Sequence, residues 1–186
     1  MLSYKLNQSL ESIATIDGLT STLNRRSLED AALQMQDMCK RINLSMAVIL
    51  IDIDHFKKVN DKYGHLTGDD VLRHIAKVVA GILRSSDVFG RYGGEEFCAF
   101  LPNTTESDAI GLAERIRAGV EANPLKLDRG SIKTTISIGV ADSVRAGYDF
   151  KGLIAAADGA LYSAKNGGRN QVVSYTQITR DTKLML

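Results

Sequence analysis

The feature that most constrains the fold is an uninterrupted apolar run that ends in carboxylates. Residues 46–51 read MAVILI, which is too short for a helix and has no polar residue for a wet face. This pattern predicts a strand buried on both faces. Asp52 and Asp54 follow directly, and a two-residue step places both side chains on one face if the strand persists. We therefore expect a layered structure around this strand, with charge concentrated at its end.

Patterns typical of helices and strands alternate along the rest of the chain. The clearest helix lies within residues 64–87, which carry an apolar stripe at helical spacing. Asp69 and Asp70 are expected to interact favourably with the positive N-terminal end of this helix. A hairpin is predicted over residues 87–101, around a pair of glycines. Further helices are predicted at residues 2–13, 26–42, 107–120 and 150–165, and further strands at residues 132–140 and, as a final edge strand, 171–175.

This order of elements predicts an α/β protein, an α+β sandwich in which helices wrap a central mixed β-sheet. The chain has 186 residues and neither an internal repeat nor a low-complexity linker, so we expect one main domain. Its boundaries are expected at residues 15–175. Residues 1–14 are interpreted as an N-terminal linker or signalling helix, and residues 176–186 as a C-terminal tail without an assigned function.

Composition excludes several classes of partner. The net charge is +1, from 23 basic and 22 acidic residues without a basic block, so a nucleic-acid or anionic membrane surface has no electrostatic support. No apolar run is long enough to cross a bilayer, and the N-terminus does not resemble a secretory signal. Cys39 and Cys98 lack the spacing of a metal site and are interpreted as reduced packing residues. A cytoplasmic location fits best.

The predicted hairpin carries a second group of carboxylates. RYGGEEFCAFL at residues 91–101 places Glu95 and Glu96 after a glycine pair, where positive φ costs little. If these glutamates reach Asp52 and Asp54 from a neighbouring strand, they repel one another. Two unit charges about 4 Å apart cost roughly 4 kcal/mol at an effective dielectric constant of 20. A divalent cation would compensate, and ligands that are all oxygen suit Mg²⁺ or Mn²⁺ completed by substrate phosphates.

Other interpretations of these acids remain open or fail. They could be solvated strand ends and turns. An EF-hand fails because Lys57 stands where that loop needs glycine and Tyr63 where it needs glutamate. A G-x-x-x-x-G-K-[ST] phosphate loop does not occur. The residues by themselves therefore indicate a metal-assisted phosphate site on a helix–sheet sandwich.

Several motifs resemble one known family. GGEEF resembles the signature of the GGDEF-domain diguanylate cyclases, in its GGEEF form. The resemblance extends over roughly residues 15–175, in the family's order. Its motifs are DGLTSTLNRR at 17–26, DIDHFKKVNDKYGHLTGDDVL at 52–72, GGEEF at 93–97, TISIGVA at 135–141 and ALYSAKNGGRNQV at 160–172.

The resemblance implies a fold similar to the adenylyl cyclase catalytic core and the polymerase palm. It implies an activity that joins two GTP molecules into cyclic di-GMP and releases two pyrophosphates. Each subunit would hold one GTP, so catalysis would require a homodimer. Two Mg²⁺ (or Mn²⁺) ions per active site would activate the attacking 3′-hydroxyl and neutralise the departing pyrophosphate.

The resemblance also assigns metal and catalytic residues. Asp52 and Glu95 would bind the cations through their side chains and Ile53 through its main-chain oxygen, with Glu96 assisting. Glu95 is the family's frequent choice as proton acceptor, although water could serve. Lys57 would stabilise charge that develops on the phosphates, and its plain alternative is a solvated lysine.

Substrate contacts are implied in the same way. Asn60 and Asp69 would read the guanine, with His65 nearby. Asp69 could otherwise be a helix N-cap, and His65 a structural histidine. Phosphate would approach the backbone at Gly93 and Gly94. The terminal phosphates would be held by Lys165 and Arg169, which are also what a cationic helix C-terminus would carry.

A separate motif, RSSD at residues 84–87, lies five residues before the glycine pair. In the family an RxxD at this spacing is the inhibitory site for cyclic di-GMP, so Arg84 and Asp87 would bind the product. The entry motif departs from the family pattern at Gly18, Ser21 and Thr22. These departures concern regulation or stability rather than chemistry.

Two other functions remain as alternatives. The domain could be a catalytically silent receptor for GTP or cyclic di-GMP, or it could make a different cyclic dinucleotide. An upstream sensory domain or a regulatory partner is expected in either case, and an isolated domain is expected to have low activity.

Overall fold

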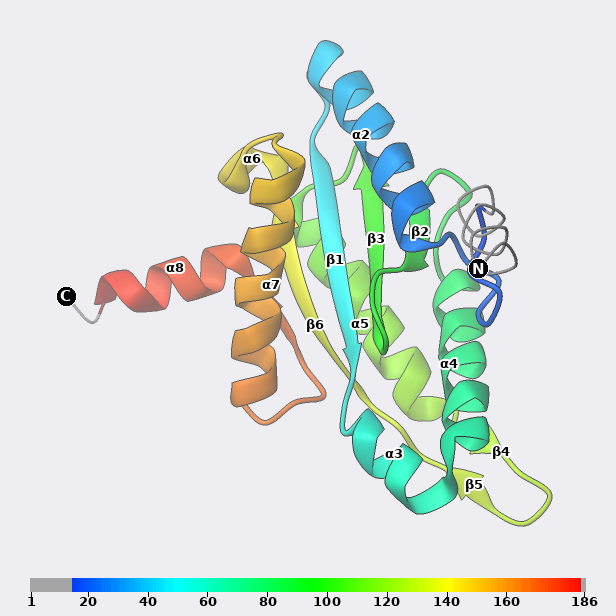
Figure 1. Cartoon of the computed structure of the whole chain (residues 1–186). Coiled ribbons are helices and arrows are strands. Elements are labelled where there is room, and N and C mark those ends of the chain that lie inside the picture. Colours follow the sequence, from blue (N-terminus) through cyan, green and yellow to red (C-terminus); the bar gives the residue numbers. More distant parts are fainter. Residues whose placement is uncertain (1–14, 185–186) are drawn as a thin grey trace, which may run out of the picture.

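The computed structural model describes residues 15–184, and within them a five-stranded sheet forms the centre of the molecule (Figure 1). β1 (Met46–Ile53) is the middle strand and pairs antiparallel with β3 (Glu96–Pro102) and with β6 (Ile136–Asp142). β2 (Val88–Arg91) forms one edge and β7 (Val172–Ser174), parallel to β6, forms the other. The sheet is therefore mixed, as predicted.

Helices cover both faces of the sheet. α2 (Arg25–Arg41) and α7 (Phe150–Asn166) pack on one face, and α4 (His65–Ala80) and α5 (Glu106–Ala122) pack on the other (Figure 1). Every residue of β1 is buried. Ile49 and Ile51 enter the core with α4 and α5, whereas Val48 and Leu50 enter the core with α2 and α7. The apolar run is thus a strand buried on both faces.

Local capping defines where three of these helices begin. The side chains of Asn24, Thr105 and Asp149 accept hydrogen bonds from the first-turn N–H groups of α2, α5 and α7. α4 instead follows Gly64, whose φ is +84°, and begins at His65. Asp69 therefore lies in the second turn of α4, and the alternative that it is an N-cap is wrong. The predicted favourable interaction of Asp69 and Asp70 with the positive N-terminal end of the helix is likewise not observed, since the first turn of α4 holds no acidic residue.

Some elements differ from the sequence prediction. The single strand predicted at residues 132–140 is split, because β5 (Ser131–Ile132) pairs with β4 (Leu125–Lys126) in a separate ladder before β6 begins. Sequence patterns did not predict α3 (Phe56–Tyr63), α6 (Ser143–Ala146) or α8 (Tyr175–Leu184). The helix predicted at residues 2–13 lies outside the described residues.

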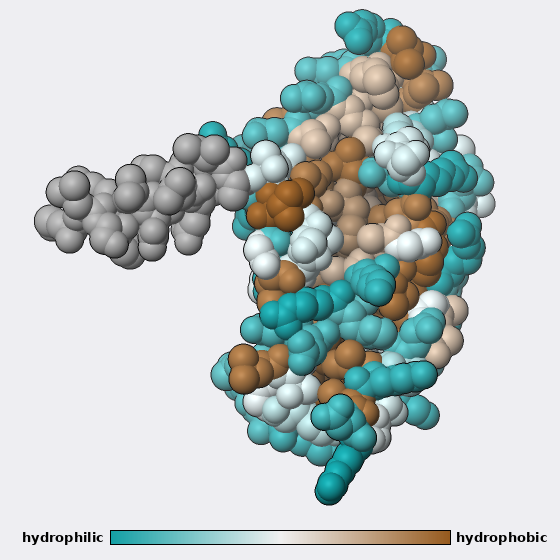
Figure 2. Space-filling view, turned by 90° about the vertical axis from the view of Figure 1, so that its right-hand side faces the viewer, coloured by the Kyte–Doolittle hydropathy of each residue, from teal (hydrophilic) through white to brown (hydrophobic). Residues whose placement is uncertain are grey.

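Two further expectations can be compared with the structure. Cys39 and Cys98 are buried free cysteines, which confirms their interpretation as packing residues. Among the helices of residues 15–184, none combines the length and the hydropathy that a bilayer span requires. Hydrophilic residues break the hydrophobic surface over the α4 side of the molecule into separate patches (Figure 2).

Candidate active site

The carboxylates predicted from the sequence meet at one end of the sheet. Asp52 lies directly opposite Glu96 in the β1–β3 register and opposite Ser137 in the β1–β6 register. Residues that pair directly across strands point their side chains to the same face. Glu95 immediately precedes β3, and its carbonyl oxygen accepts the N–H of Ile53 at 3.4 Å. Strand pairing therefore carries both glutamates to the end of β1.

Burial and nearby negative charge destabilise the charged forms of these three acids. The pKa of Glu95 is raised, first by burial and then by the nearby charge of Asp52. The pKa of Glu96 is raised by the same two causes in the same order. Asp52 is only 7% exposed, and burial raises its pKa despite a nearby ammonium group. The charged forms of the three acids are therefore disfavoured, and added positive charge would stabilise them.

That ammonium group belongs to Lys165, in the last turn of α7. Its Nζ lies 2.7 Å from Asp52 Oδ2. Its charge also opposes the raised pKa of both Glu95 and Glu96, and Arg169 acts on Asp52 in the same direction. The interpretation that a divalent cation compensates the carboxylates is therefore incomplete, because α7 already supplies part of the compensation.

The donor set fits a cation of the magnesium type. Asp52, Glu95 and Glu96 offer only oxygen atoms, which Mg²⁺ and Mn²⁺ prefer. Within residues 15–184, no three Asp, Glu, His or Cys side chains are grouped so that they could hold a metal ion by themselves. A site that is open to substrate needs fewer protein ligands, since Mg²⁺ is usually held by one or two carboxylates together with water and substrate phosphates. The raised pKa values are the observation that favours added positive charge.

Asp54 does not join this cluster as a free ligand. Its carboxylate accepts hydrogen bonds from Thr135 Oγ1 at 2.7 Å, Ser137 Oγ at 2.6 Å and the N–H of Asn170 at 3.0 Å. The two aspartates after the apolar run therefore have different environments, which their spacing could not predict.

The turn between β2 and β3 is shaped by glycine and braced by arginine. A Cβ on Gly93 would lie 2.8 Å from Glu96 Oε2, whereas Gly94 faces open space. Neither glycine has a positive φ, so they supply room rather than a left-handed turn. Arg91 donates to the Gly94 carbonyl oxygen from Nη2 at 2.6 Å and from Nε at 3.1 Å. Arg91 Nη1 also lies 3.4 Å from both carboxylate oxygens of Asp17, in the entry motif.

The residues expected to read guanine lie where α3 meets α4. Asn60 packs on Gly68, the residue before Asp69, so closely that a Cβ on Gly68 would overlap Asn60 Oδ1. Asn60 Oδ1 is buried and has no hydrogen-bond partner within the described part of the chain. An unpaired buried acceptor costs about 1–3 kcal/mol, so its presence favours a site where a ligand supplies the donor.

Two other predicted residues stand apart. Lys57 in α3 and His65 at the start of α4 are exposed, and neither side chain forms a hydrogen bond or ion pair with the described residues. Lys57 lies at the start of α3, close behind β1, and His65 lies at the junction of α3 and α4, and neither residue has a contact among residues 15–184 that defines its role.

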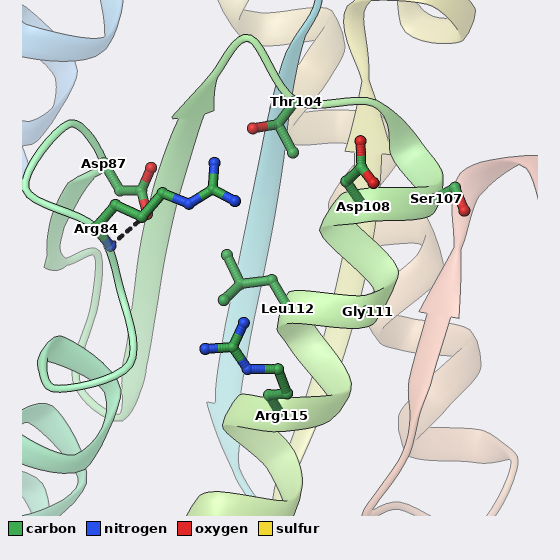
Figure 3. A pocket seen from close by; sticks show the side chains of 8 residues that line it. All are labelled: Arg84, Asp87, Thr104, Ser107, Asp108, Gly111, Leu112 and Arg115. Carbon is green, nitrogen blue, oxygen red and sulfur yellow. Dashed lines mark hydrogen bonds between the residues drawn. The ribbon is translucent and has the colours of Figure 1, made fainter.

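The RSSD motif forms one wall of a pocket of about 350 Å³. Asp87 closes the motif on itself, because its Oδ2 accepts the Arg84 backbone N–H at 2.8 Å. The Arg84 guanidinium is left to extend toward α5, where Arg115 points back into the same space (Figure 3). Two guanidinium groups facing one pocket favour an anionic or oxygen-rich ligand.

Sequence reasoning missed four contributors to these sites. Arg91 and Gly68 act through packing and hydrogen bonds that only the fold creates, and the same holds for Asn170. Arg115 lies 28 positions after the RSSD motif, on helix α5, whereas the motif lies in the connection between α4 and β2. Arg115 is exposed on α5, so no burial pattern in the sequence could have identified it.

Comparisons with known proteins agree with this geometry. The family model described as "Diguanylate cyclase, GGDEF domain" matches residues 14–171. The response regulator PleD of Caulobacter vibrioides is 42% identical over 177 residues, which cover 92% of this chain and 38% of PleD. The chain therefore spans about two fifths of the length of that relative.

Solved structures give the same result. The GGDEF domain of DgcB from Caulobacter crescentus, in complex with c-di-GMP, is 34% identical with a TM-score of 0.82, and the match covers 88% of this chain and 96% of that solved domain. The diguanylate cyclase SiaD from Pseudomonas aeruginosa, in complex with its activator SiaC, is 35% identical with a TM-score of 0.82, over 93% of this chain and 66% of SiaD. With signature acids, sheet order and both comparisons in agreement, this chain belongs to the GGDEF-domain diguanylate cyclase family.

Proposed function

We propose that this domain is a diguanylate cyclase, which condenses two GTP molecules into cyclic di-GMP and releases two pyrophosphates. One observation carries the proposal in a chain of this family. Asp52, Glu95 and Glu96 converge on Lys165 at the end of β1, and all three acids have raised pKa values. Such a site would be stabilised by bound cations and suits a polyphosphate substrate that brings them.

GTP would be bound by its two ends. Asn60 and Asp69 hold the guanine, which is supported by the unpaired Asn60 Oδ1, and His65 lies beside them. A carboxylate can accept from both N1–H and the 2-amino group of guanine, a pair that adenine does not present. At the other end, Lys165 and Arg169 hold the terminal phosphates, which pass the backbone at the signature turn.

Asp52 and Glu95 would hold Mg²⁺ or Mn²⁺ with their side chains, Ile53 with its main-chain oxygen, and Glu96 would assist. Two such ions per active site would lower the pKa of the attacking 3′-hydroxyl and neutralise the leaving pyrophosphate. Glu95 is the candidate acceptor for the 3′-hydroxyl proton, with water as the alternative because a carboxylate bound to a metal ion is a poor base. Lys57 would neutralise charge on the phosphates.

The reaction joins two nucleotides, so two domains must face each other as a homodimer. The catalytic unit is residues 15–175 in this proposal, and a preceding sensory segment or a separate partner brings the two copies together. SiaD, one of the similar structures, is solved in complex with its activator SiaC. The product would bind in the pocket of Arg84 and Asp87 and inhibit the enzyme.

The direct test is incubation of the protein with GTP and Mg²⁺ over a range of protein concentrations, with assays for pyrophosphate and cyclic di-GMP. We expect two pyrophosphate molecules for each cyclic di-GMP, with a rate that rises more steeply than the protein concentration. Glu95→Gln should abolish turnover while the fold is retained. Absence of product even from an artificially dimerised fusion would leave the silent receptor, which binds nucleotide without turning it over.

A further inference from the structure

Asp54 lies beside the proposed active site without belonging to it. Its side chain is buried, with an exposed fraction of 5%. Two of its three hydrogen-bond donors, Thr135 and Ser137, come from the segment that leads into and forms β6. The third is the backbone N–H of Asn170, which is 116 residues away along the chain. The carboxylate therefore joins the end of β1 to the loop that follows α7.

That loop has a backbone conformation that needs support. Gly168, Arg169 and Asn170 have φ values of +116°, +66° and +45°. Positive φ is unfavourable for a residue such as arginine. The Arg169 N–H donates to the Ala164 carbonyl oxygen at 3.0 Å, which ties the loop to the last turn of α7. The second connection is the hydrogen bond from the Asn170 N–H to Asp54.

The Asn170 side chain also connects the loop to α5. Its Nδ2 donates to Glu121 Oε1 at 2.9 Å, and its Oδ1 accepts from Arg117 Nη1 at 2.8 Å. Asn170 is therefore held from the sheet through its backbone and from α5 through its side chain. Arg169, which precedes it, is exposed and lies between the two fixed points.

We propose that Asp54 is a positioning residue for nucleotide binding: by fixing the Gly168–Asn170 loop it aims Arg169, and through the end of α7 Lys165, at the terminal phosphates of GTP. The inference rests on the proposed function, in which these two cations hold the phosphates. It gives the two aspartates that follow the apolar run different roles: Asp52 belongs to the charged cluster, and Asp54 holds the loop that carries Arg169.

A purely structural role for Asp54 makes a different prediction. General destabilisation would weaken the binding of every ligand alike, whereas a misplaced Arg169 would weaken only the binding of ligands that carry terminal phosphates. The test measures the affinities of two ligands by calorimetry in the presence of Mg²⁺. One ligand is GMP, and the other is a GTP analogue with a methylene group between its α- and β-phosphates. Asp54→Asn should weaken the triphosphate analogue about tenfold and change GMP affinity less than twofold.

A double-mutant cycle shows whether Asp54 acts through Arg169. Arg169→Ala should weaken the triphosphate analogue, and adding Asp54→Asn to it should produce less than the product of the two single effects. Additive losses would overturn the proposal, as would equal losses for both ligands. If Asp54→Asn does not fold, Thr135→Val removes one of the three donors, and it should change the same ratio of affinities in the same direction by a smaller factor.

Asp142→Asn is the matched control. Asp142 is equally buried, with an exposed fraction of 4%, and it accepts backbone N–H groups of Glu106 and Arg145 far from the loop. This variant should lose stability without changing the affinity ratio. The binding test is independent of turnover. If the wild-type protein binds the analogue but makes no cyclic di-GMP, the proposed enzyme activity is wrong. The role of Asp54 is still decided by the ratio of the analogue affinity to the GMP affinity.

Discussion

The Lys165 ammonium lies 2.7 Å from the buried carboxylate of Asp52, although the two residues are 113 positions apart in the sequence. The side chains are 31% and 9% exposed, so water screens the pair only in part. Lys165 also lies close enough to Glu95 and Glu96 to act on the pKa of both. One helix C-terminus therefore supplies the counter-charge for carboxylates from two strands.

Removal of this ammonium group should cost stability. Lys165→Met leaves Asp52 buried without its partner, and we expect a loss of about 1–3 kcal/mol in the free energy of unfolding. Adding Asp52→Asn should restore most of that loss, because the buried charge is then gone. Urea denaturation of both single variants and the double variant measures the coupling. Additive losses in the double variant would show that the pair contributes little.

Stability should depend on pH through the same carboxylates. The pKa values of Asp52, Glu95 and Glu96 are raised above their ordinary values of 3.8, 4.5 and 4.5, so the folded state binds these protons more tightly than the unfolded state. Their contribution to stability is fully present below the ordinary values and is lost as pH rises through the folded ones. Denaturation of Glu96→Gln without divalent cations should show a smaller loss than wild type as pH rises from acidic toward neutral. A steeper loss in the variant would contradict the assignment.

Gly68 should control nucleotide affinity without controlling stability. Gly68→Ala adds a Cβ that overlaps Asn60 Oδ1 and must displace that side chain. We expect the KM for GTP to rise about tenfold, while the higher helix propensity of alanine offsets up to about 1 kcal/mol of any packing loss. Gly159→Ala in α7 is the control, because its Cβ would only make an ordinary 3.5 Å contact with Ile178. Equal effects of the two substitutions on KM would refute the prediction.

Arg91 should act through the signature turn rather than through charge alone. Arg91→Lys keeps the charge but cannot donate twice to the Gly94 carbonyl oxygen in the planar geometry of arginine. We expect kcat to fall about tenfold, a change that corresponds to about 1.4 kcal/mol in the barrier. Asp17→Asn should lower kcat less, since the contacts between Asp17 and Arg91 are 3.4 Å long. Steady-state kinetics with GTP measures both variants.

Arg115 should contribute to product inhibition. Because it faces Arg84 across the same pocket, Arg115→Ala should weaken the binding of cyclic di-GMP about tenfold while leaving GTP turnover without product unchanged. Arg84→Ala should abolish that binding. Arg129→Ala, in the exposed β4–β5 connection, serves as the control for loss of one positive charge. Calorimetric titration with cyclic di-GMP distinguishes these cases, and unchanged affinity in Arg84→Ala would rule out the pocket as the product site.

Local patterns in the sequence were sufficient for much of the fold. The run at residues 46–51 has no polar face, so burial on both sides was its only stable environment, and the structure confirms it. Apolar stripes with period 3.6 located α4 and α7 to within a few residues. α3 was missed because its eight residues bury only Phe56 and Val59, too few to form a periodic stripe.

The acids that gather at the site were also identified from the sequence, because Asp52 ends a buried strand and the two glutamates begin a paired one. Only the tertiary structure decided which groups compensate and support them. Antiparallel pairing set Asp52 opposite Glu96, packing of α7 brought Lys165 to both, and the loop after α7 gave Asp54 a separate partner in Asn170. Residue type and spacing determine which side chains are charged or buried. The distance between charges far apart in the chain is set by strand register and helix packing, and that distance determines their electrostatic energy.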